Sequence, residues 1–351
     1  MKRFELMILL LTASAASCLK LPDRDNCDKP APDVITDPAS FIAADAAIIN
    51  GRFAAHGQNT LVTFEFGPDN RYGQNIEPYT SPVNQVSFRT VSFHVTGLRP
   101  STTYHFRLKA EGECNESAGE DITFTTLNYE ETGIIFNPDI SYGTLTDIDG
   151  NIYKTVTIGT RTWMAENLRS QRFNDGMGMI NDVNNYSWSS RTDPAWCYYS
   201  NIVQMRLAAG ILYNWYAIGT GKLCPTGWHV PSDEEWNNLI VTLGGEASAA
   251  GKLKMTGGNM WPSPNSGSSN QSGFTAIPAG LRYGFIGSNG GFFYDMGWKG
   301  VWWTSTQTSI TTAKYREIDQ AGVIAGTLSN PGKYQLNNKN FGFSVRCIKD
   351  F

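Results

Sequence analysis

This chain of 351 residues has little that serves nucleic-acid binding or common catalysis, and each shortage excludes a class of function. Only 17% of its residues are charged, and the 28 Lys and Arg form no basic run, which argues against nucleic acid as a partner. The sequence contains no G-x-S-x-G elbow and no phosphate-binding loop. Helical periodicity is scarce, whereas glycine is abundant with 35 residues. This balance predicts a folded protein built mainly from short strands and turns.

The first residues have the pattern of a targeting segment that is removed from the mature protein. Lys2 and Arg3 precede an apolar run at 6–11 that is too short to span a bilayer. The sequence A-A-S-C ending at Cys18 resembles the lipobox of bacterial lipoproteins, which implies cleavage before Cys18 and attachment of lipid to its thiol. We therefore expect a lipoprotein signal peptide at 1–17; cleavage without lipid is the alternative.

A flexible tether is expected at 18–32, because this stretch is rich in proline and aspartate. It weakly resembles the acidic export tags of surface lipoproteins in Bacteroidetes. The resemblance implies a lipid-anchored protein of the outer membrane that is displayed at the cell surface. The membrane would then be a partner through the lipid anchor.

Residues 33–127 alternate as expected for a small all-β sandwich. The strand candidates lie at 47–53, 61–66, 87–95, 103–110 and 121–126. The segment L-R-P-S-T-T-Y at 98–104 resembles the fibronectin type III pattern L-x-P-x-T-x-Y, in which the tyrosine forms a corner that ties a loop to the start of a strand. Modules of that family are usually spacers or binding modules, and we expect no catalysis here.

Five cysteines remain once Cys18 is acylated, and an odd count leaves at least one unpaired within the chain. They are Cys27, Cys114, Cys197, Cys224 and Cys347. In a fibronectin-like sandwich the start of the first strand and the loop between the last two strands lie at the same pole. Cys27 precedes the first strand and Cys114 lies in that loop, so we predict a disulfide between them.

A linker at 128–142 leads to a second domain at 143–351. Its first motif, D-I-D-G-N-I-Y at 147–153, has an Asp-Gly pair between alternating flanks and predicts a hairpin turn. A calcium loop is the alternative, but an EF-hand needs glycine at the sixth position, whereas Gly150 is the fourth residue. A second hairpin is expected around Gly159.

Two helices are expected in this domain. The apolar segment L-A-A-G-I-L-Y-N-W-Y-A-I at 207–218 predicts a buried helix with its aromatics in the core. The segment C-P-T-G-W-H-V-P-S-D-E-E-W at 224–236 predicts a strand that ends at Val230 and a helix capped by Ser232 and Glu235. Two glycines then stop that helix.

Six motifs occur in the order found in the Fibrobacter succinogenes major paralogous domain, which the chain resembles over 143–351. They are YKTVTIGTRTWMAENL, LYNWYAI, CPTGWHVPSDEEW, SGFTAIPAG, the WWTS cluster at 302–305 and the terminal GFSVRC. The last motif, at 342–347, alternates like a strand and is expected to meet the segment at 224–236.

A more distant resemblance implies a fold for this domain. HVPSDEEW, YDMGWKGVWWTS and GFSVRC are similar to elements of the formylglycine-generating enzyme and C-type lectin-like superfamily. The implied fold brings the terminal strand close to the strand before the second helix, so Cys224 and Cys347 are expected to pair. Cys197 would then be a free thiol, although a Cys197 to Cys224 pairing stays open. The predicted fold class is multidomain, an all-β fibronectin type III-like sandwich followed by an α+β C-type lectin-like domain.

Enzymatic activity is not expected. Formylglycine-generating enzymes need paired redox-active cysteines, and this chain has none between Pro225 and Arg346. His229 is the domain's only histidine, so no zinc spacing exists and a structural hydrogen bond is its expected role. No pair of carboxylates stands out as a glycosidase acid and nucleophile. We expect neither a cofactor nor a metal.

Binding is the remaining class of function, and lectin-like folds commonly place it in the irregular region that corresponds to 257–300. Aromatic faces stack on sugars and amides bond to hydroxyls, so this region suits a carbohydrate; the same aromatics could instead form a core. S-P-N at 263–265 lacks the acidic position of the E-P-N motif, so calcium-dependent sugar binding is not expected. The candidate ligand-binding residues are Trp261, Tyr283, Phe292, Tyr294, Asp295 and Trp298.

These observations predict a non-enzymatic lipoprotein at the cell surface. Its function would be adhesion or recognition of a glycan or surface protein through the C-terminal domain. A structural component of the cell envelope or of a surface appendage is the first alternative. A diverged enzyme of the formylglycine-generating superfamily is the second.

Overall fold

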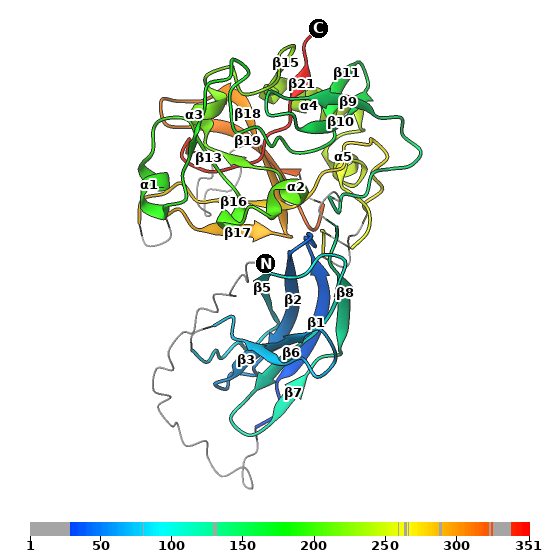
Figure 1. Ribbon diagram of the computed structural model, residues 1–351, viewed down its shortest axis with the longest axis vertical. Coiled ribbons are helices and arrows are strands. Elements are labelled where there is room, and N and C mark those ends of the chain that lie inside the picture. Colours follow the sequence, from blue (N-terminus) through cyan, green and yellow to red (C-terminus); the bar gives the residue numbers. More distant parts are fainter. Residues whose placement is uncertain are drawn as a thin grey trace, which may run out of the picture.

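The computed structural model describes residues 29–351 apart from 80, 129–131, 259, 263–264, 266, 288–289, 323 and 326–337. The lipobox with Cys18 and the predicted disulfide partner Cys27 lie outside the described residues. The described chain is mostly β structure in two parts, a sandwich and an assembly of sheets with short helices (Figure 1). Within these ranges no helix has the length and apolar character needed to cross a membrane.

The first part, called the N-terminal sandwich, packs two antiparallel sheets face to face. Its strands are β1 (Asp33–Ser40), β2 (Ala46–Ala54), β3 (Leu61–Gly67), β4 (Gln74–Ile76), β5 (Arg89–Thr96), β6 (Thr103–Glu111), β7 (Glu116–Ala118) and β8 (Ile122–Thr125). One sheet has the order β1-β2-β5, and the other has the order β4-β3-β6-β7 with β8 also paired to β6. All five predicted strands are present, whereas β1, β4 and β7 were not predicted from the sequence.

The tyrosine corner predicted for this sandwich is present. The backbone N–H of Arg99 donates to the hydroxyl of Tyr104 at 3.0 Å. This hydrogen bond ties the loop before β6 to the start of that strand. The ring of Tyr104 stacks on Phe66 and Phe124, with centroids 5.3 and 5.8 Å apart. One side chain therefore fixes a loop and fills the sandwich core.

The second part, called the C-terminal assembly, contains three sheets. Its strands are β9 (Gly143–Thr146), β10 (Ile152–Ile158), β11 (Arg161–Met164), β12 (Ile180–Asn181), β13 (Ala195–Cys197), β14 (Leu212–Tyr213), β15 (Trp228–His229), β16 (Ala279–Arg282), β17 (Phe293–Met296), β18 (Lys299–Gln307), β19 (Ala313–Asp319), β20 (Ile324–Ala325) and β21 (Ile348–Lys349). The sheet orders are β15-β21-β11-β10-β9, β12-β13-β14 and β17-β16-β18-β19-β20. The helices are α1 (Asn185–Ser190), the 3-10 turn η2 (Tyr199–Asn201), α2 (Met205–Ala209), α3 (Trp215–Ile218), α4 (Asp233–Thr242) and α5 (Glu246–Leu253).

The motif at 147–153 forms the predicted turn. Oδ1 of Asp147 accepts hydrogen bonds from the backbone N–H groups of Asp149 and Asn151, both at 2.9 Å. Gly150 takes φ 80°, a conformation that glycine adopts without strain. The aspartate at the start of the motif is thus used to close the turn between β9 and β10.

The prediction of a single helix at 207–218 is wrong. The segment is divided into α2, the short strand β14 and α3, because Gly210 takes φ 83° and ends α2. A Cβ at Gly210 would lie 2.6 Å from the Cβ of Asn167, so the close approach requires glycine. Asn214 then caps α3 by accepting from the N–H of Ala217. The apolar side chains are nevertheless in the core, as Tyr213 and Trp215 are buried.

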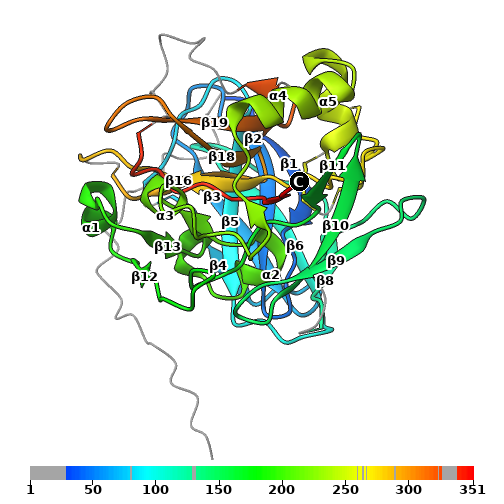
Figure 2. The same ribbon diagram turned by 90° about the horizontal axis from the view of Figure 1, so that it is seen from above.

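Helix α4 begins as predicted, with a complete capping box. Ser232 Oγ accepts from the N–H of Glu235, and the Glu235 carboxylate accepts from the N–H of Ser232. The glycines at 244 and 245 end α4, but the chain then begins α5, which was not predicted. Helices α4 and α5 lie next to each other at one edge of the assembly (Figure 2).

The continuous strand predicted at 342–347 is wrong. Phe343 forms a bridge to Tyr213, Gly342 to Arg282 and Ser344 to Trp302, so the segment runs between sheets and pairs briefly with each. The strand β21, just after the motif, is the part that pairs with β15. The two motifs themselves meet, as expected, where Cys347 approaches Cys224.

A disulfide closes this part of the fold. Cys224, before β15, is bonded to Cys347, before β21, which is the pairing expected from the lectin-like resemblance. Cys197 is a free, buried thiol, so the open alternative of a Cys197 to Cys224 bond is excluded.

The sandwich and the C-terminal assembly share a hydrophobic core. Phe41 and Ile48 of the sandwich belong to the same buried cluster as Tyr199, Met205 and Met260 of the assembly. Phe41 is completely buried. The rings of His94 on β5 and Tyr199 lie 5.6 Å apart across the same junction. Apolar packing therefore fixes the two parts against each other, with β17 above the ends of β2 and β5 in Figure 1.

Candidate ligand-binding site at the junction

The turn between β17 and β18 brings predicted ligand-binding residues to the sandwich. The N–H of Trp298 donates to the carbonyl of Asp295 at 2.9 Å, and Gly297 takes φ 83° inside the turn. Asp295 has φ 61°, a left-handed conformation that aspartate tolerates better than most residues. The turn places Tyr294, Asp295 and Trp298 at two pockets that the sandwich helps to line.

The first pocket, called the β5 pocket, has a volume of about 500 Å³. Ser92 and His94 of β5 line it from the sandwich. Tyr199, Tyr294 and Asp295 line it from the C-terminal assembly. Aromatic and polar groups from both parts of the chain therefore share one cavity.

The second pocket, called the β1 pocket, has a volume of about 210 Å³. Asp37 of β1, Asn50 and Arg52 of β2 and Thr90 of β5 line it from the sandwich, and Gln320 lines it from the assembly. The wall that the sandwich contributes is thus mostly polar.

Trp298 lines both pockets, which share it and Met296. The side chain of Trp298 is partly exposed. Among the described residues, its indole N–H has no hydrogen-bond partner and its ring has no aromatic or cationic neighbour in contact. The indole N–H groups of Trp215, Trp302 and Trp303 donate to protein acceptors. Those of Trp188 and Trp236 also lack a partner, but both side chains are buried and line neither pocket. Trp298 thus offers a flat apolar face and a free donor to a ligand.

The sandwich supplies a row of polar side chains beside this tryptophan. The strand register places Asp37, Asn50 and Ser92 next to one another on β1, β2 and β5. Ser92 Oγ donates to Asn50 Oδ1 at 2.8 Å. Arg52 donates to Asp37 through Nε and Nη2, at 2.8 and 2.9 Å. Since side chains alternate along a strand, this row lies on the outer face of the sheet and the intervening residues fill the core.

The charged groups around the pockets are paired. Lys299 Nζ lies 3.5 Å from Glu317 and 3.9 Å from Asp295. Burial raises the pKa of Glu317, although the neighbouring Lys299 opposes the change. Burial also lowers the pKa of His94, which favours a neutral ring at neutral pH. The two pockets therefore present aromatic faces and hydrogen-bonding groups, and among the described residues that line them no cation is unpaired.

A metal centre is not found in the part of the chain that the structure describes. No group of three or more His, Cys, Asp or Glu side chains within it is arranged to hold an ion.

The structure brings together three of the six candidate ligand-binding residues, namely Tyr294, Asp295 and Trp298. The prediction that Trp261 binds a ligand is wrong, because its side chain is completely buried. Its indole N–H donates to the carbonyl of Ala276 at 2.9 Å, and the ammonium of Lys254 lies 4.4 Å from its ring centroid. Trp261 is therefore part of the core and is not available to a ligand.

The two remaining candidates lie outside both pockets. Tyr283 packs against Tyr294 and Phe341, with ring centroids 4.4 and 5.3 Å away, and so supports the β5 pocket from behind. Phe292 is 47% exposed but lines neither pocket. Phe292 is accordingly a useful control for the aromatic residues that do.

Sequence reasoning missed the sandwich half of the site. Asn50, Ser92 and His94 lie in strands that were predicted correctly, but no binding role was predicted for them. The alternating polar positions 50 and 52 are a signal in the sequence. Only the docking of the second part shows that this surface faces a tryptophan.

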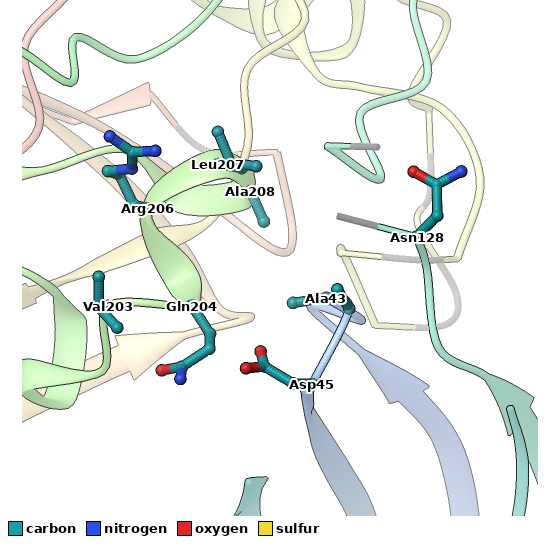
Figure 3. Close-up of a pocket in the computed structure, with 9 residues that line it drawn as sticks. Ala43, Asp45, Asn128, Val203, Gln204, Arg206, Leu207 and Ala208 are labelled. Carbon is teal, nitrogen blue, oxygen red and sulfur yellow. The ribbon is translucent and has the colours of Figure 1, made fainter. Parts of the chain in front are cut away.

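Figure 3 shows a third hollow at the junction, with a volume of about 260 Å³. Asp45 of the sandwich and Gln204 before α2 approach each other at its edge. The guanidinium of Arg206 points away from Asp45, so the polar groups do not converge. This hollow is therefore a weaker candidate than the pockets beside Trp298.

These features define the chain as a multidomain, mostly β protein with two pockets at the junction of its two parts. Residues 156–349 match the Fibrobacter succinogenes major domain, and the chain belongs to that family. No curated protein matches the chain significantly.

Solved structures similar to parts of the chain have low overall agreement. The sensor domain of the anti-sigma factor RsgI4 of Pseudobacteroides cellulosolvens matches with 22% identity over 27% of this chain and 94% of that chain, with a TM-score of 0.22. A human fibronectin type III domain matches with 19% identity over 32% of this chain and 85% of that chain, with a TM-score of 0.20. Scores this low give no basis for transferring a function.

Proposed function

We propose that this protein recognises a glycan at the junction between its two parts and acts without catalysis. The observation that carries the proposal is the position of Trp298, whose ring face and indole N–H have no described partner and lie between two pockets. An available aromatic face next to hydrogen-bonding side chains suits a sugar ring, which has apolar C–H faces and polar edges.

The shared core supports this proposal energetically. Phe41 and Ile48 pack among residues of the C-terminal assembly, so the cleft exists before a ligand arrives. Little conformational entropy is then lost when the two walls hold a sugar between them. If the two parts moved freely, binding would have to order them, and the conformational entropy lost in doing so would lower the affinity.

We assign the C-terminal assembly to the C-type lectin-like superfamily as an α+β domain. The support is the path of the chain, in which β21 returns beside β15, just before α4. The disulfide between Cys224 and Cys347 closes the same region. The binding residues Tyr294, Asp295 and Trp298 lie in the region between α5 and the last strands, where the resemblance expects them.

A role without catalysis is supported by the surroundings of His229. Its Nδ1 lies 2.6 Å from Asp350, and its Nε2 lies 3.1 Å from Glu235, which also belongs to the capping box. These contacts connect the start of α4 to β21. His229 and Glu235 are therefore used to hold the fold together, far along the chain from Trp298.

We also propose that the protein is a lipoprotein of the outer membrane, displayed at the cell surface. The support is the A-A-S-C sequence ending at Cys18 and the acidic, proline-rich stretch that follows. Incorporation of labelled palmitate should be lost in the Cys18→Ser variant. Equal labelling of both proteins would contradict the lipid anchor.

A glycan array followed by isothermal titration calorimetry tests the binding function. The purified protein should give reproducible signals that fall at least about tenfold in Trp298→Ala, which corresponds to about 1.4 kcal/mol. Trp298→Phe should retain part of the affinity because the ring remains.

Phe292→Ala is the matched control, since Phe292 is an exposed aromatic residue of the same region outside both pockets. It should bind as the original protein does. Silence across arrays of bacterial, plant and animal glycans would overturn the proposal, and so would full binding by Trp298→Ala.

A further inference from the structure

The two pockets beside Trp298 differ in chemistry but lie along one continuous wall of the sandwich. Ser92 lines the β5 pocket and Asn50 lines the β1 pocket, and the two side chains share a hydrogen bond of 2.8 Å. Met296 and Trp298 form the facing wall of both pockets. The two pockets therefore adjoin each other at the tryptophan, and we treat them together as one cleft.

The cleft extends across the sheet from β5 to β1. Those strands are separated by β2, so the path covers two interstrand spacings, or about 10 Å. That span is longer than a single sugar ring. The residues at its rims are exposed, with Ser92 on one side and Pro38 and Gly258 on the other. A ligand longer than the two pockets would therefore meet solvent at both rims.

The charge of the cleft restricts the ligand further. Arg52 is held by both of its hydrogen bonds to Asp37, and Lys299 is shared by Asp295 and Glu317. No unpaired cation among the described lining residues is available for a uronate or a sulfate. The carboxylates of Asp37 and Asp295 also line the pockets and repel an anionic sugar. The amides and hydroxyls that line them match the hydroxyl groups of neutral sugars.

We infer that the cleft binds the interior of a linear neutral oligosaccharide, with one sugar ring in each pocket, a third ring against Trp298 between them and the chain continuing past both rims. This inference rests on the proposed glycan recognition and specifies its ligand class. A site of this kind gains affinity with each ring until both pockets are filled. Its affinity also does not depend on the chemical groups at the two ends of the sugar chain.

The first test is the dependence of affinity on chain length, measured by calorimetry on the full protein. The probes are cello-, xylo-, manno- and chito-oligosaccharides from disaccharide to hexasaccharide, together with polygalacturonate as an acidic chain. In the series that binds, affinity should rise at least about tenfold from disaccharide to hexasaccharide and should survive reduction of the terminal ring. Equal affinity for both lengths, or loss of binding after end reduction, would overturn the inference while leaving glycan recognition intact. Tighter binding of polygalacturonate would do the same.

The second test separates the two pockets with matched substitutions on β5. Thr90→Ala changes the β1 pocket, Ser92→Ala changes the β5 pocket, and Thr96→Ala changes an exposed residue of the same strand that lines neither. Loss of one hydrogen bond should weaken hexasaccharide binding about 2- to 10-fold in each pocket variant and leave Thr96→Ala unchanged. Disaccharide binding should respond to one pocket variant only. A hexasaccharide that is insensitive to either pocket variant would refute a two-pocket ligand.

Failure of every neutral and acidic chain to bind would instead overturn the proposed function itself. The two hypotheses are therefore distinguished by whether any glycan binds at all.

Discussion

Arg316 on β19 donates from Nη2 to Oδ1 of Asp233 at 2.5 Å, which fixes the first residue of α4 to the sheet beneath it. Both side chains are almost fully buried, and Lys314 binds the other carboxylate oxygen at 2.7 Å. Asp233→Asn keeps the shape but leaves a buried guanidinium without its counter-charge. We expect a loss of about 3–5 kcal/mol in the free energy of unfolding, measured by urea denaturation. Glu234→Gln, its exposed neighbour, should change stability by less than about 0.5 kcal/mol.

The capping residue Glu235 predicts how stability depends on acid. Burial opposes its ionisation, but hydrogen bonds from Ser232 and His229 outweigh burial and lower the pKa of the Glu235 carboxyl below its ordinary 4.5. A group whose pKa is lower in the folded state stabilises the fold above its unfolded value and loses that contribution as the pH falls. The free energy of unfolding should therefore fall, as the pH drops below the ordinary pKa of 4.5, more steeply in the original protein than in Glu235→Gln. Parallel pH profiles would show that Glu235 contributes nothing to acid sensitivity.

The shared core predicts that the two parts unfold together. Phe41→Ala removes a completely buried ring from the junction and should cost about 3–5 kcal/mol. Differential scanning calorimetry should give one transition for the original protein and two for the variant, because the sandwich and the assembly lose their common packing. Phe88→Ala, at an exposed sandwich position, is the control and should keep a single transition. Two transitions in the original protein would contradict a rigid junction.

The disulfide predicts a measurable contribution to stability. It joins residues separated by 123 positions, and a double substitution of Cys224 and Cys347 by alanine should lower the free energy of unfolding by about 2–5 kcal/mol, measured by urea denaturation.

Burial raises the pKa of the Cys197 thiol to about 11, so this thiol should resist alkylation in the folded protein at neutral pH. A peptide map without reductant should contain the linked peptide with Cys224 and Cys347. A linked peptide containing Cys197 would refute this pairing.

Local patterns allowed part of the fold to be predicted from the sequence. The capping box joins Ser232 to Glu235, and the tyrosine corner joins Arg99 to Tyr104. In both, the interacting groups are a few residues apart, so the sequence spacing fixes most of the geometry. The helix expected at 207–218 failed because Gly210 must approach Asn167, a contact between distant segments that apolar periodicity does not encode.

Only the half of the candidate site that belongs to the C-terminal assembly could be predicted from the sequence. Trp261 and Trp298 both lie outside the strands and helices, where no periodic pattern of polar and apolar residues distinguishes a buried ring from an available one. Lys254 and Ala276 enclose Trp261, whereas Trp298 ends beside the sandwich. The difference arises from tertiary packing. The polar wall of the cleft required, in addition, knowledge of how two predicted modules dock.

The strand β10 also bears on which fragment of this protein can fold on its own. The family match begins at residue 156, inside β10 (Ile152–Ile158), and so omits Tyr153. That tyrosine is completely buried, and its hydroxyl donates to Asp147 at 2.5 Å and accepts from the N–H of Arg169 at 2.8 Å. A fragment cut at 156 would lose these partners and open the buried pair of Arg169 and Glu166 to water. We therefore expect a fragment that folds on its own to be longer than the family match.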